Sequence, residues 1–160
     1  CYPMEFVEKN RPLPFFLHCD DVEYGLRCGK KPIIIEGVQV WHETYDKRMT
    51  PLMQYYDTRN PLFVNQLYGF LPEPLQLLQQ WKDKMTAFHV KGDWLSEYYV
   101  ILAMNDFLKG MGWLKRIDAG KYHKKLQKVK SCRVKNAICW RLVEHRAKKK
   151  FMVHKNNGSG

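Results

Sequence analysis

The sequence lacks several features that would define its class at once. No apolar run reaches the roughly 18 consecutive residues that a membrane-spanning helix needs. No signal-peptide pattern is expected where the sequence opens, and the residues show no glycine-rich phosphate loop, internal repeat or Ser-His-Asp arrangement. None of the five cysteines forms a C-x-x-C pair. An odd number of cysteines without paired spacing favours reduced thiols and a cytoplasmic setting, and it argues against a zinc site.

Positive charge is what the chain has in excess. Its 160 residues include 27 Lys and Arg against 16 Asp and Glu, for a net charge of +11. This charge points to an anionic partner: an acidic membrane surface, a polyanionic glycan, a lipid-linked diphosphate or nucleic acid. The alternative is a basic tail that only water contacts. A hydrophobic content of 45% is enough to bury the core of about one domain.

Two adjacent carboxylates, Asp20 and Asp21, stand where an apolar run stops and an amphipathic segment begins. Such a pair can bind a metal, accept a proton from a hydroxyl, or cap the helix that follows. Asp is a favoured N-cap residue, so capping is the ordinary interpretation. Gly29 and Pro32 then predict the end of this short helix.

Short strands are predicted on both sides of that helix. The apolar segments are Phe15–Leu17, Ile33–Ile35 and Val38–Glu43, and a turn separates the last two. Strand ends are where ligand sites gather in an α/β sheet. The pattern therefore places the Asp pair and His42 at strand ends.

The remainder of the chain is predicted to be mostly helical, because apolar residues recur at intervals of three and four. Residues 1–11 and 110–114 are expected to be non-helical. Thr50 and Asp93 are suitable N-caps for two of the helices. The last helix ends in a basic amphipathic segment, which could lie on an anionic bilayer or be a solvated helix end. The expected helices are Pro51–Tyr68, Glu73–Phe88, Trp94–Lys109 and Arg133–Phe151.

Three motifs in order make the sequence resemble a known enzyme family. They are HCDDVEYGLR at 18–27, VWHE at 40–43 and YYDTRN at 55–60. Together they are similar to the second half of a family 2 glycosyltransferase of the galactofuranosyltransferase-like branch. The resemblance implies the GT-A fold and an inverting, metal-dependent transfer of a sugar from a nucleotide-sugar.

The resemblance also implies roles for particular residues. Asp21 matches the general base that deprotonates the acceptor hydroxyl, and Asp20 matches a residue that contacts the acceptor or supports the base. His42 matches a ligand of the divalent metal. A carboxylate suits proton removal, and Mn²⁺ or Mg²⁺ suits neutralisation of the departing diphosphate.

Three further residues are substrate-binding candidates. By the same resemblance, Trp41 and Glu23 would line or support the acceptor pocket. Arg59 lies on a Tyr- and Arg-bearing helix face that could hold a sugar or a phosphate. Aromatic residues at helical spacing are, however, more often part of a core.

The donor-binding half and the Asp-x-Asp motif of such an enzyme are not in this sequence, which opens at Cys1. We therefore expect an acceptor-side fragment that is inactive alone. The predicted fold class is α+β and mostly helical, with short strands of an incomplete GT-A sheet. Residues 1–48 would belong to the catalytic domain, 51–151 to a helical region and 152–160 to a flexible tail. Exposed strand edges or helix faces could form a homodimer.

The predicted function is transfer of galactofuranose or another hexose to a cell-surface glycan or lipid-linked acceptor, in polysaccharide biosynthesis. The enzyme would be cytoplasmic, or peripheral on the inner face of the membrane. The alternative is a basic helical module that binds anionic lipid or, less favoured, nucleic acid. The enzyme hypothesis predicts that Asp21 and His42 converge on one pocket. The binding hypothesis predicts one continuous positive face over residues 115–150.

Overall fold

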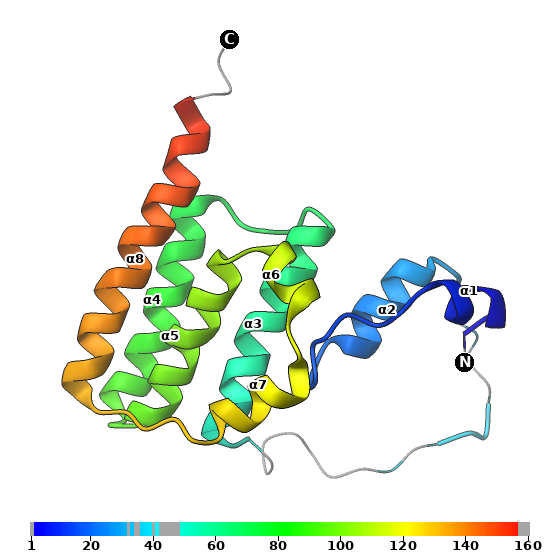
Figure 1. Ribbon diagram of the computed structural model, residues 1–160, viewed down its shortest axis with the longest axis horizontal. Helices are drawn as coiled ribbons and strands as arrows, with labels where there is room; N and C mark the ends of the chain where they lie inside the picture. The colour runs from blue at the N-terminus through cyan, green and yellow to red at the C-terminus, as the bar shows by residue number, and fades with distance from the viewer. Residues whose placement is uncertain (1, 32, 34–35, 40, 42–48, 157–160) are drawn as a thin grey trace.

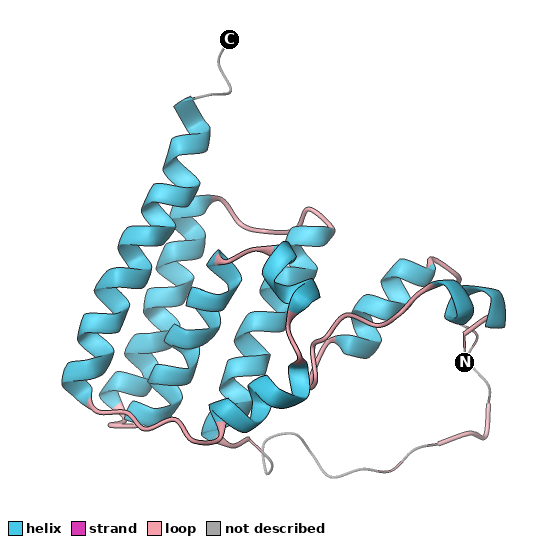
Figure 2. Cartoon of the chain, viewed as in Figure 1, coloured by secondary structure: helices cyan, strands magenta, loops and turns pink. Residues whose placement is uncertain are grey.

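The computed structural model describes residues 2–31, 33, 36–39, 41 and 49–156, with side chains to residue 151. Every regular element in these residues is a helix, as Figure 2 shows. The bounds are α1 Met4–Lys9, α2 Asp20–Cys28, α3 Pro51–Leu67, α4 Pro74–Val90, α5 Trp94–Leu108, α6 Met111–Arg116, α7 Ala119–Leu126 and α8 Arg133–Asn156.

The prediction of an α+β fold with strands of a GT-A sheet is wrong for the described residues. Phe15–Leu17, expected as a strand, is an irregular loop in which Phe16 has a φ of 72°. That backbone conformation lies outside the strand region. The predicted strands Ile33–Ile35 and Val38–Glu43 lie partly outside the described residues. Their described positions are loop, and Glu36-Gly37 forms the predicted turn.

Most of the helix predictions are confirmed. Thr50 accepts a hydrogen bond from the backbone N–H of Met53 at 3.4 Å, and Asp93 accepts one from Ser96 at 3.0 Å. Both therefore cap their helices as expected. The predictions of non-helical structure over 1–11 and 110–114 are wrong, because these segments contain α1 and the start of α6.

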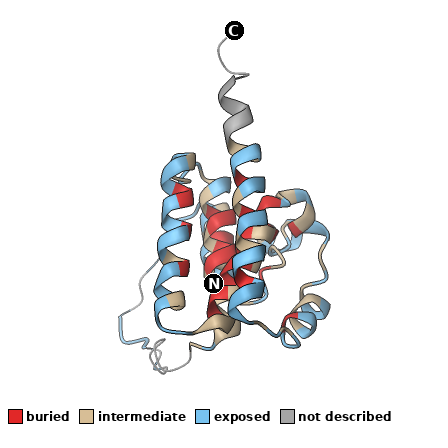
Figure 3. Cartoon of the chain, turned by 90° about the vertical axis from the view of Figure 1, so that its left-hand side faces the viewer, coloured by how far each residue is buried: buried red, intermediate tan, exposed pale blue. Residues whose placement is uncertain are grey.

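Four helices, α3, α4, α5 and α8, form a bundle in which α5 contacts the other three (Figure 1). Helix α5 is accordingly buried on most sides, with Val100, Ile101, Met104 and Phe107 at most 2% exposed. Full burial of one such side chain contributes roughly 1.5–3 kcal/mol. Figure 3 shows the buried residues gathered in the middle of the bundle and the exposed ones on its outer faces.

Helices α1 and α2 form a small arm that projects from the bundle (Figure 1). Tyr24 on α2 holds the arm together: its ring packs edge-on against Tyr2 and Phe6 at 4.8 and 4.9 Å, and its hydroxyl donates to Asn10 O at 2.8 Å. The buried ring of Phe15 anchors the arm to the bundle core. The segment between that anchor and α2 therefore determines where the Asp pair lies.

Candidate functional site

The segment before α2, residues 15–19, has an unusual backbone and is called the acidic-helix loop below. Phe16, His18 and Cys19 have φ values of 72°, 61° and 62°. No other non-glycine residue in the described part of the chain has a positive φ. A left-handed conformation costs a non-glycine residue on the order of 1–3 kcal/mol. Surrounding contacts must offset that cost.

Helix α3 supplies those contacts through Asn60 and its neighbour Arg59. The Asn60 side-chain amide donates to Leu17 O at 2.5 Å and to His18 O at 2.8 Å, and it lies 3.4 Å from Phe15 O. Arg59 Nη2 donates to Phe15 O at 2.9 Å, and Arg59 Nε donates to Asn60 Oδ1 at 2.8 Å. The second bond fixes which way the amide faces. We call these two residues the Arg59–Asn60 clamp.

A buried polar network supports the clamp from behind. Arg59 Nη1 donates to the Tyr55 hydroxyl at 3.0 Å, which donates to Asp106 Oδ2 at 2.7 Å. Asp106 also accepts from the Tyr122 hydroxyl and from Lys109 Nζ, each at 2.5 Å. Burial raises the pKa of Tyr55; the Arg59 charge opposes this and the Asp106 charge adds to it, so the hydroxyl stays a donor. Because the Asp106 carboxylate is paired with Lys109 and accepts from two tyrosine hydroxyls, its burial is tolerated.

An aromatic stack covers the outer side of the loop. The Phe16 ring lies 4.2 Å from the His123 ring of α7 and 5.8 Å from the Tyr56 ring of α3, and both pairs are stacked. Tyr56 Oη and His123 Nδ1 are 2.9 Å apart, within hydrogen-bond distance. Burial lowers the pKa of His123 and raises the pKa of Tyr56 to about 12. The stack therefore favours neutral rings.

Asp20 and Asp21 are the first two residues of α2, and both are exposed. The capping prediction is confirmed in part. Neither Asp is the N-cap residue, which is Cys19 and makes no side-chain cap bond. Asp21 Oδ1 nevertheless accepts from a first-turn amide, the N–H of Val22, at 2.8 Å. The positive end of the helix dipole favours both carboxylates here. Burial raises the pKa of the Cys19 thiol, and the charges of Asp57, Asp21 and Asp20 raise it further.

The other predicted substrate-binding residues lie in different surroundings. Glu23 is 2% exposed and forms a two-pronged ion pair with Arg27, with N–O distances of 3.1 Å. Arg59 is 1% exposed, and its Nε, Nη1 and Nη2 all donate within the chain. Trp41 is 88% exposed. The structure thus gathers Asp20, Asp21 and Glu23 on α2, and Arg59 reaches the preceding loop from α3.

The predicted metal ligand His42 lies outside the described residues. Within the described residues, no three His, Cys, Asp or Glu side chains come together in a way that could hold a metal ion. The convergence of Asp21 and His42, and the choice of Mn²⁺ or Mg²⁺, therefore stay predictions.

Two residues were not recognised from the sequence. Asn60 lies in the YYDTRN motif, to which the resemblance gives no role at this position, and His123 lies outside all three motifs. The signal for Asn60 was available: an Arg-Asn pair on the same helix face as Tyr55 and Tyr56 is a costly set of polar groups to bury unless each has a partner. No local signal pointed to His123.

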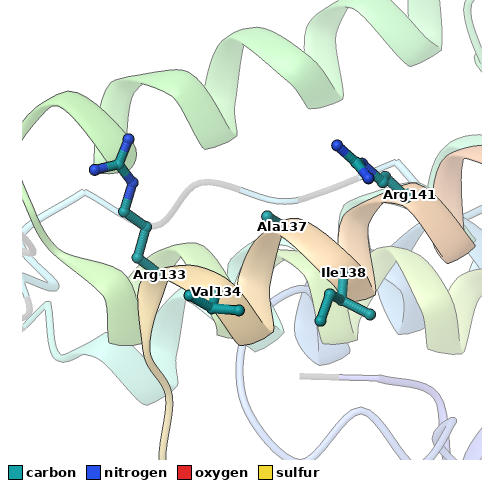
Figure 4. Close-up of a pocket in the computed structure, with 5 residues that line it drawn as sticks. All are labelled: Arg133, Val134, Ala137, Ile138 and Arg141. Atoms are coloured by element: carbon teal, nitrogen blue, oxygen red, sulfur yellow. The ribbon is translucent and has the colours of Figure 1, made fainter.

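A second surface lies on the outer face of α8. Val134, Ile138 and Leu142 recur every four residues and are 69%, 56% and 61% exposed. Arg133 and Arg141 flank them, and both extend to the same side of α8 in Figure 4. A shallow depression is lined by these arginines with Val134, Ala137 and Ile138. None of the described helices is both long and apolar enough to cross a membrane.

Comparison with known proteins relates this chain to a glycosyltransferase. The relative is the galactofuranosyltransferase GlfT2 of Mycolicibacterium smegmatis (strain ATCC 700084 / mc(2)155), which is 33% identical over 118 residues. The matched region is 68% of this chain but only 18% of that protein, so the chain spans about a fifth of its relative's length. No protein-family model matches the chain, and no solved structure matches it.

This similarity confirms the coarser part of the sequence resemblance, a distant relation to a glycosyltransferase. The finer assignments to the GT-A fold, to family 2 and to an inverting, metal-dependent mechanism stay predictions.

Proposed function

We propose that this chain is the acceptor-side part of an inverting, metal-dependent glycosyltransferase. The enzyme moves galactofuranose or another hexose from a nucleotide-sugar to a cell-surface glycan or a lipid-linked acceptor. The similarity to a galactofuranosyltransferase is the observation that carries this proposal. The exposed carboxylates at the start of α2 are consistent with it, because an incoming hydroxyl can reach them.

In the proposed reaction, the acceptor hydroxyl oxygen attacks the anomeric carbon of the donor sugar. The new C–O bond forms while the bond to the nucleotide diphosphate breaks, so the configuration inverts. Asp21 takes the hydroxyl proton as general base, and Asp20 contacts the acceptor or supports Asp21. The diphosphate leaves with the bonding electron pair.

Glu23, Trp41 and Arg59 complete the proposed acceptor side. The buried Glu23–Arg27 ion pair stiffens α2 beneath the Asp pair. The exposed indole of Trp41 is free to pack against a sugar ring. Arg59 acts on substrate only through the loop that it holds, because it is 1% exposed and each of its three nitrogens already donates within the chain.

A bound Mn²⁺ or Mg²⁺ would neutralise charge on the departing diphosphate. The proposal places one ligand, His42, on this chain. The described residues supply no further ligand cluster, so the remaining ligands would come from the donor-binding half of the full-length enzyme.

The test is transfer of a labelled hexose from a nucleotide-sugar by the full-length protein. We expect Asp21→Asn to reduce kcat by about 100-fold or more, since general base catalysis contributes about 10²–10⁴-fold. Asp83→Asn, which changes a carboxylate on α4, is the matched control and should keep full activity. Transfer that survives Asp21→Asn unchanged would remove Asp21 as the base, and a wild-type protein without transfer would remove the enzyme hypothesis.

A second function is favoured by the outer face of α8, and it is contact with an anionic lipid surface. The exposed apolar residues there lie beside arginines, and α8 carries eight basic residues against Glu144 alone. Clustered Lys and Arg are attracted to anionic headgroups, and exposed apolar side chains beside them can enter the headgroup layer. Such binding would hold the enzyme peripherally on the inner face of the membrane.

Vesicle sedimentation tests this second function. The chain should sediment with vesicles of mixed neutral and anionic phospholipid but not with neutral vesicles, and an Ile138→Ser, Leu142→Ser variant should bind more weakly. Leu75→Ser, at an exposed apolar position on α4, is the control. Binding to nucleic acid without binding to anionic vesicles would contradict the lipid proposal. So would a homodimer in analytical ultracentrifugation that the Ile138→Ser, Leu142→Ser variant no longer forms, because the α8 face would then be a dimer interface.

A further inference from the structure

We propose that the Arg59–Asn60 clamp is the positioning device for the catalytic carboxylates. It would hold the acidic-helix loop in its left-handed conformation and thereby aim Asp20 and Asp21. This inference rests on the proposed function for the role of Asp21. It goes beyond that proposal by assigning the placement of the base to the helical bundle, through Asn60.

The first step is that the Asp pair has little support of its own. Both side chains are exposed, and the Asp21 carboxylate accepts only a local bond from Val22 among the bonds found for it. The position of the two carboxylates therefore follows that of α2. The Tyr2 and Tyr68 hydroxyls donate to Asp21 O and Glu23 O of α2 at 3.3 and 3.4 Å. The direction in which α2 leaves the loop depends on the backbone angles of Phe16, His18 and Cys19.

The second step is that the clamp contacts that backbone directly. One side-chain amide, that of Asn60, lies within 2.8 Å of both Leu17 O and His18 O. Arg59 holds a third carbonyl, Phe15 O, two residues before Leu17, at 2.9 Å. Asn60 and Arg59 are 0% and 1% exposed, so their donors depend on these carbonyls for partners. A buried donor left unpaired is costly, so the loop is strongly biased toward the observed angles.

The third step is that other contacts to the loop depend on the same conformation. Phe16 has its ring stacked on His123 while its φ is 72°. His18 Nδ1 lies 3.6 Å from Asp57 Oδ1, one turn before the clamp on α3. Helices α3 and α7 thus hold the loop from two directions, and the bundle acts as a rigid base for the acidic helix.

Asn60→Asp is the sharpest variant, because it has the same shape and still accepts from Arg59 Nε but can no longer donate to the loop carbonyls. In the 160-residue chain, one-bond Cα–Hα couplings from NMR report the sign of φ at Phe16, His18 and Cys19. We expect the positive φ values to be lost in Asn60→Asp. Asn65→Asp, the same change on the same helix, is the control and should retain them.

In the full-length protein, Asn60→Asp should lower kcat by about 100-fold, the size expected when a reacting group is misplaced by about 1 Å. The KM for the nucleotide-sugar should stay unchanged, because the clamp contacts only the acceptor-side loop. A purely structural role would lower the amount of active enzyme and leave the kcat of the folded fraction unchanged, so kcat is normalised to folded protein.

If Asn60→Asp does not fold, Arg59→Lys is the second variant. It keeps the positive charge but cannot bond Phe15 O and Asn60 Oδ1 together, so we expect a smaller shift in the same couplings and in kcat. Positive φ values that persist in the variant would overturn the proposal. So would a normal kcat in a variant whose loop has changed, provided that Asp21→Asn is inactive.

Failure of the proposed function is distinguishable from failure of this inference. An active Asp21→Asn enzyme would refute the base assignment, whereas the NMR couplings report on the clamp whether or not the protein transfers sugar.

Discussion

Helix α3 has two buried stretches, and they are held in opposite ways. Its later stretch, Leu62, Phe63 and Val64, belongs to the apolar core of the bundle. One turn earlier, Arg59 and Asn60 are just as buried, but they are held by hydrogen bonds to the acidic-helix loop and to each other. The apolar stretch tolerates changes that preserve volume, whereas the polar stretch tolerates almost none, because each lost partner leaves a buried polar group unpaired.

The largest loss of stability is expected on the apolar side. Phe107→Ala on α5 removes a 2% exposed ring that packs against Phe63 at 5.2 Å and Trp81 at 6.1 Å. We expect the free energy of unfolding to fall by about 3–5 kcal/mol in urea denaturation. Leu142→Ala, at an exposed position on α8, should change it by less than about 0.5 kcal/mol. Equal losses in the two variants would show that α5 is not the centre of the core.

A loss of similar size is expected on the polar side from Arg59→Met. This change keeps most of the side-chain volume but removes the donors to Phe15 O and Tyr55, and it leaves the Asp106 carboxylate with one fewer nearby cation. Breaking a buried charged network by removing one partner costs about 3–5 kcal/mol. Urea denaturation measures it, with Arg146→Met on the exposed side of α8 as control. An unchanged free energy of unfolding in Arg59→Met would mean that packing, and not hydrogen bonding by Arg59, holds this part of α3.

The apolar and the polar contacts of α3 also differ in how far the sequence alone predicts them. Spacings of three and four, together with the caps Thr50 and Asp93, predict the long helices because both signals are local. The apolar run Phe15–Leu17 was misread as a strand. Its conformation is set by Asn60, which is 43 positions away from Leu17, and no local pattern contains that contact.

The candidate site likewise has features that the local sequence predicts and features that it does not. Asp20 and Asp21 could be recognised because an apolar run stops at them. Their exact position in the helix could not be predicted. Cys19 rather than either Asp occupies the N-cap, and it does so in a left-handed conformation that non-glycine residues seldom adopt. The resemblance gave the order of the motifs. The fold shows that Asn60 in the YYDTRN motif bonds the backbone of Leu17 and His18, where the HCDDVEYGLR motif begins.

A smaller effect is expected at the start of α3. Thr50→Ala removes the side-chain acceptor for the Met53 N–H, and loss of such a cap costs about 1 kcal/mol. Because this end of α3 lies about two turns from the clamp, the couplings at Phe16 and His18 should not change. Thermal unfolding gives the stability change and NMR gives the couplings. A change in the couplings would show that the clamp depends on the whole of α3 rather than on its central turn.

The smallest effect is a pH dependence at the edge of the polar side. Burial lowers the pKa of His123 below its ordinary value of 6.5 in the folded chain. As the pH falls through that value, the unfolded chain takes up the proton first, so the stabilisation from neutral His123 is present above about pH 6.5 and is lost below it. Unfolding by urea at about pH 7.5 and about pH 5.5 should therefore show a steeper fall in stability for the wild type than for His123→Phe, which keeps a ring to stack on Phe16 but does not titrate. Parallel losses in the two proteins would mean that the stack holds the loop equally well around a charged imidazole, so that protonation of His123 is not what weakens the polar side.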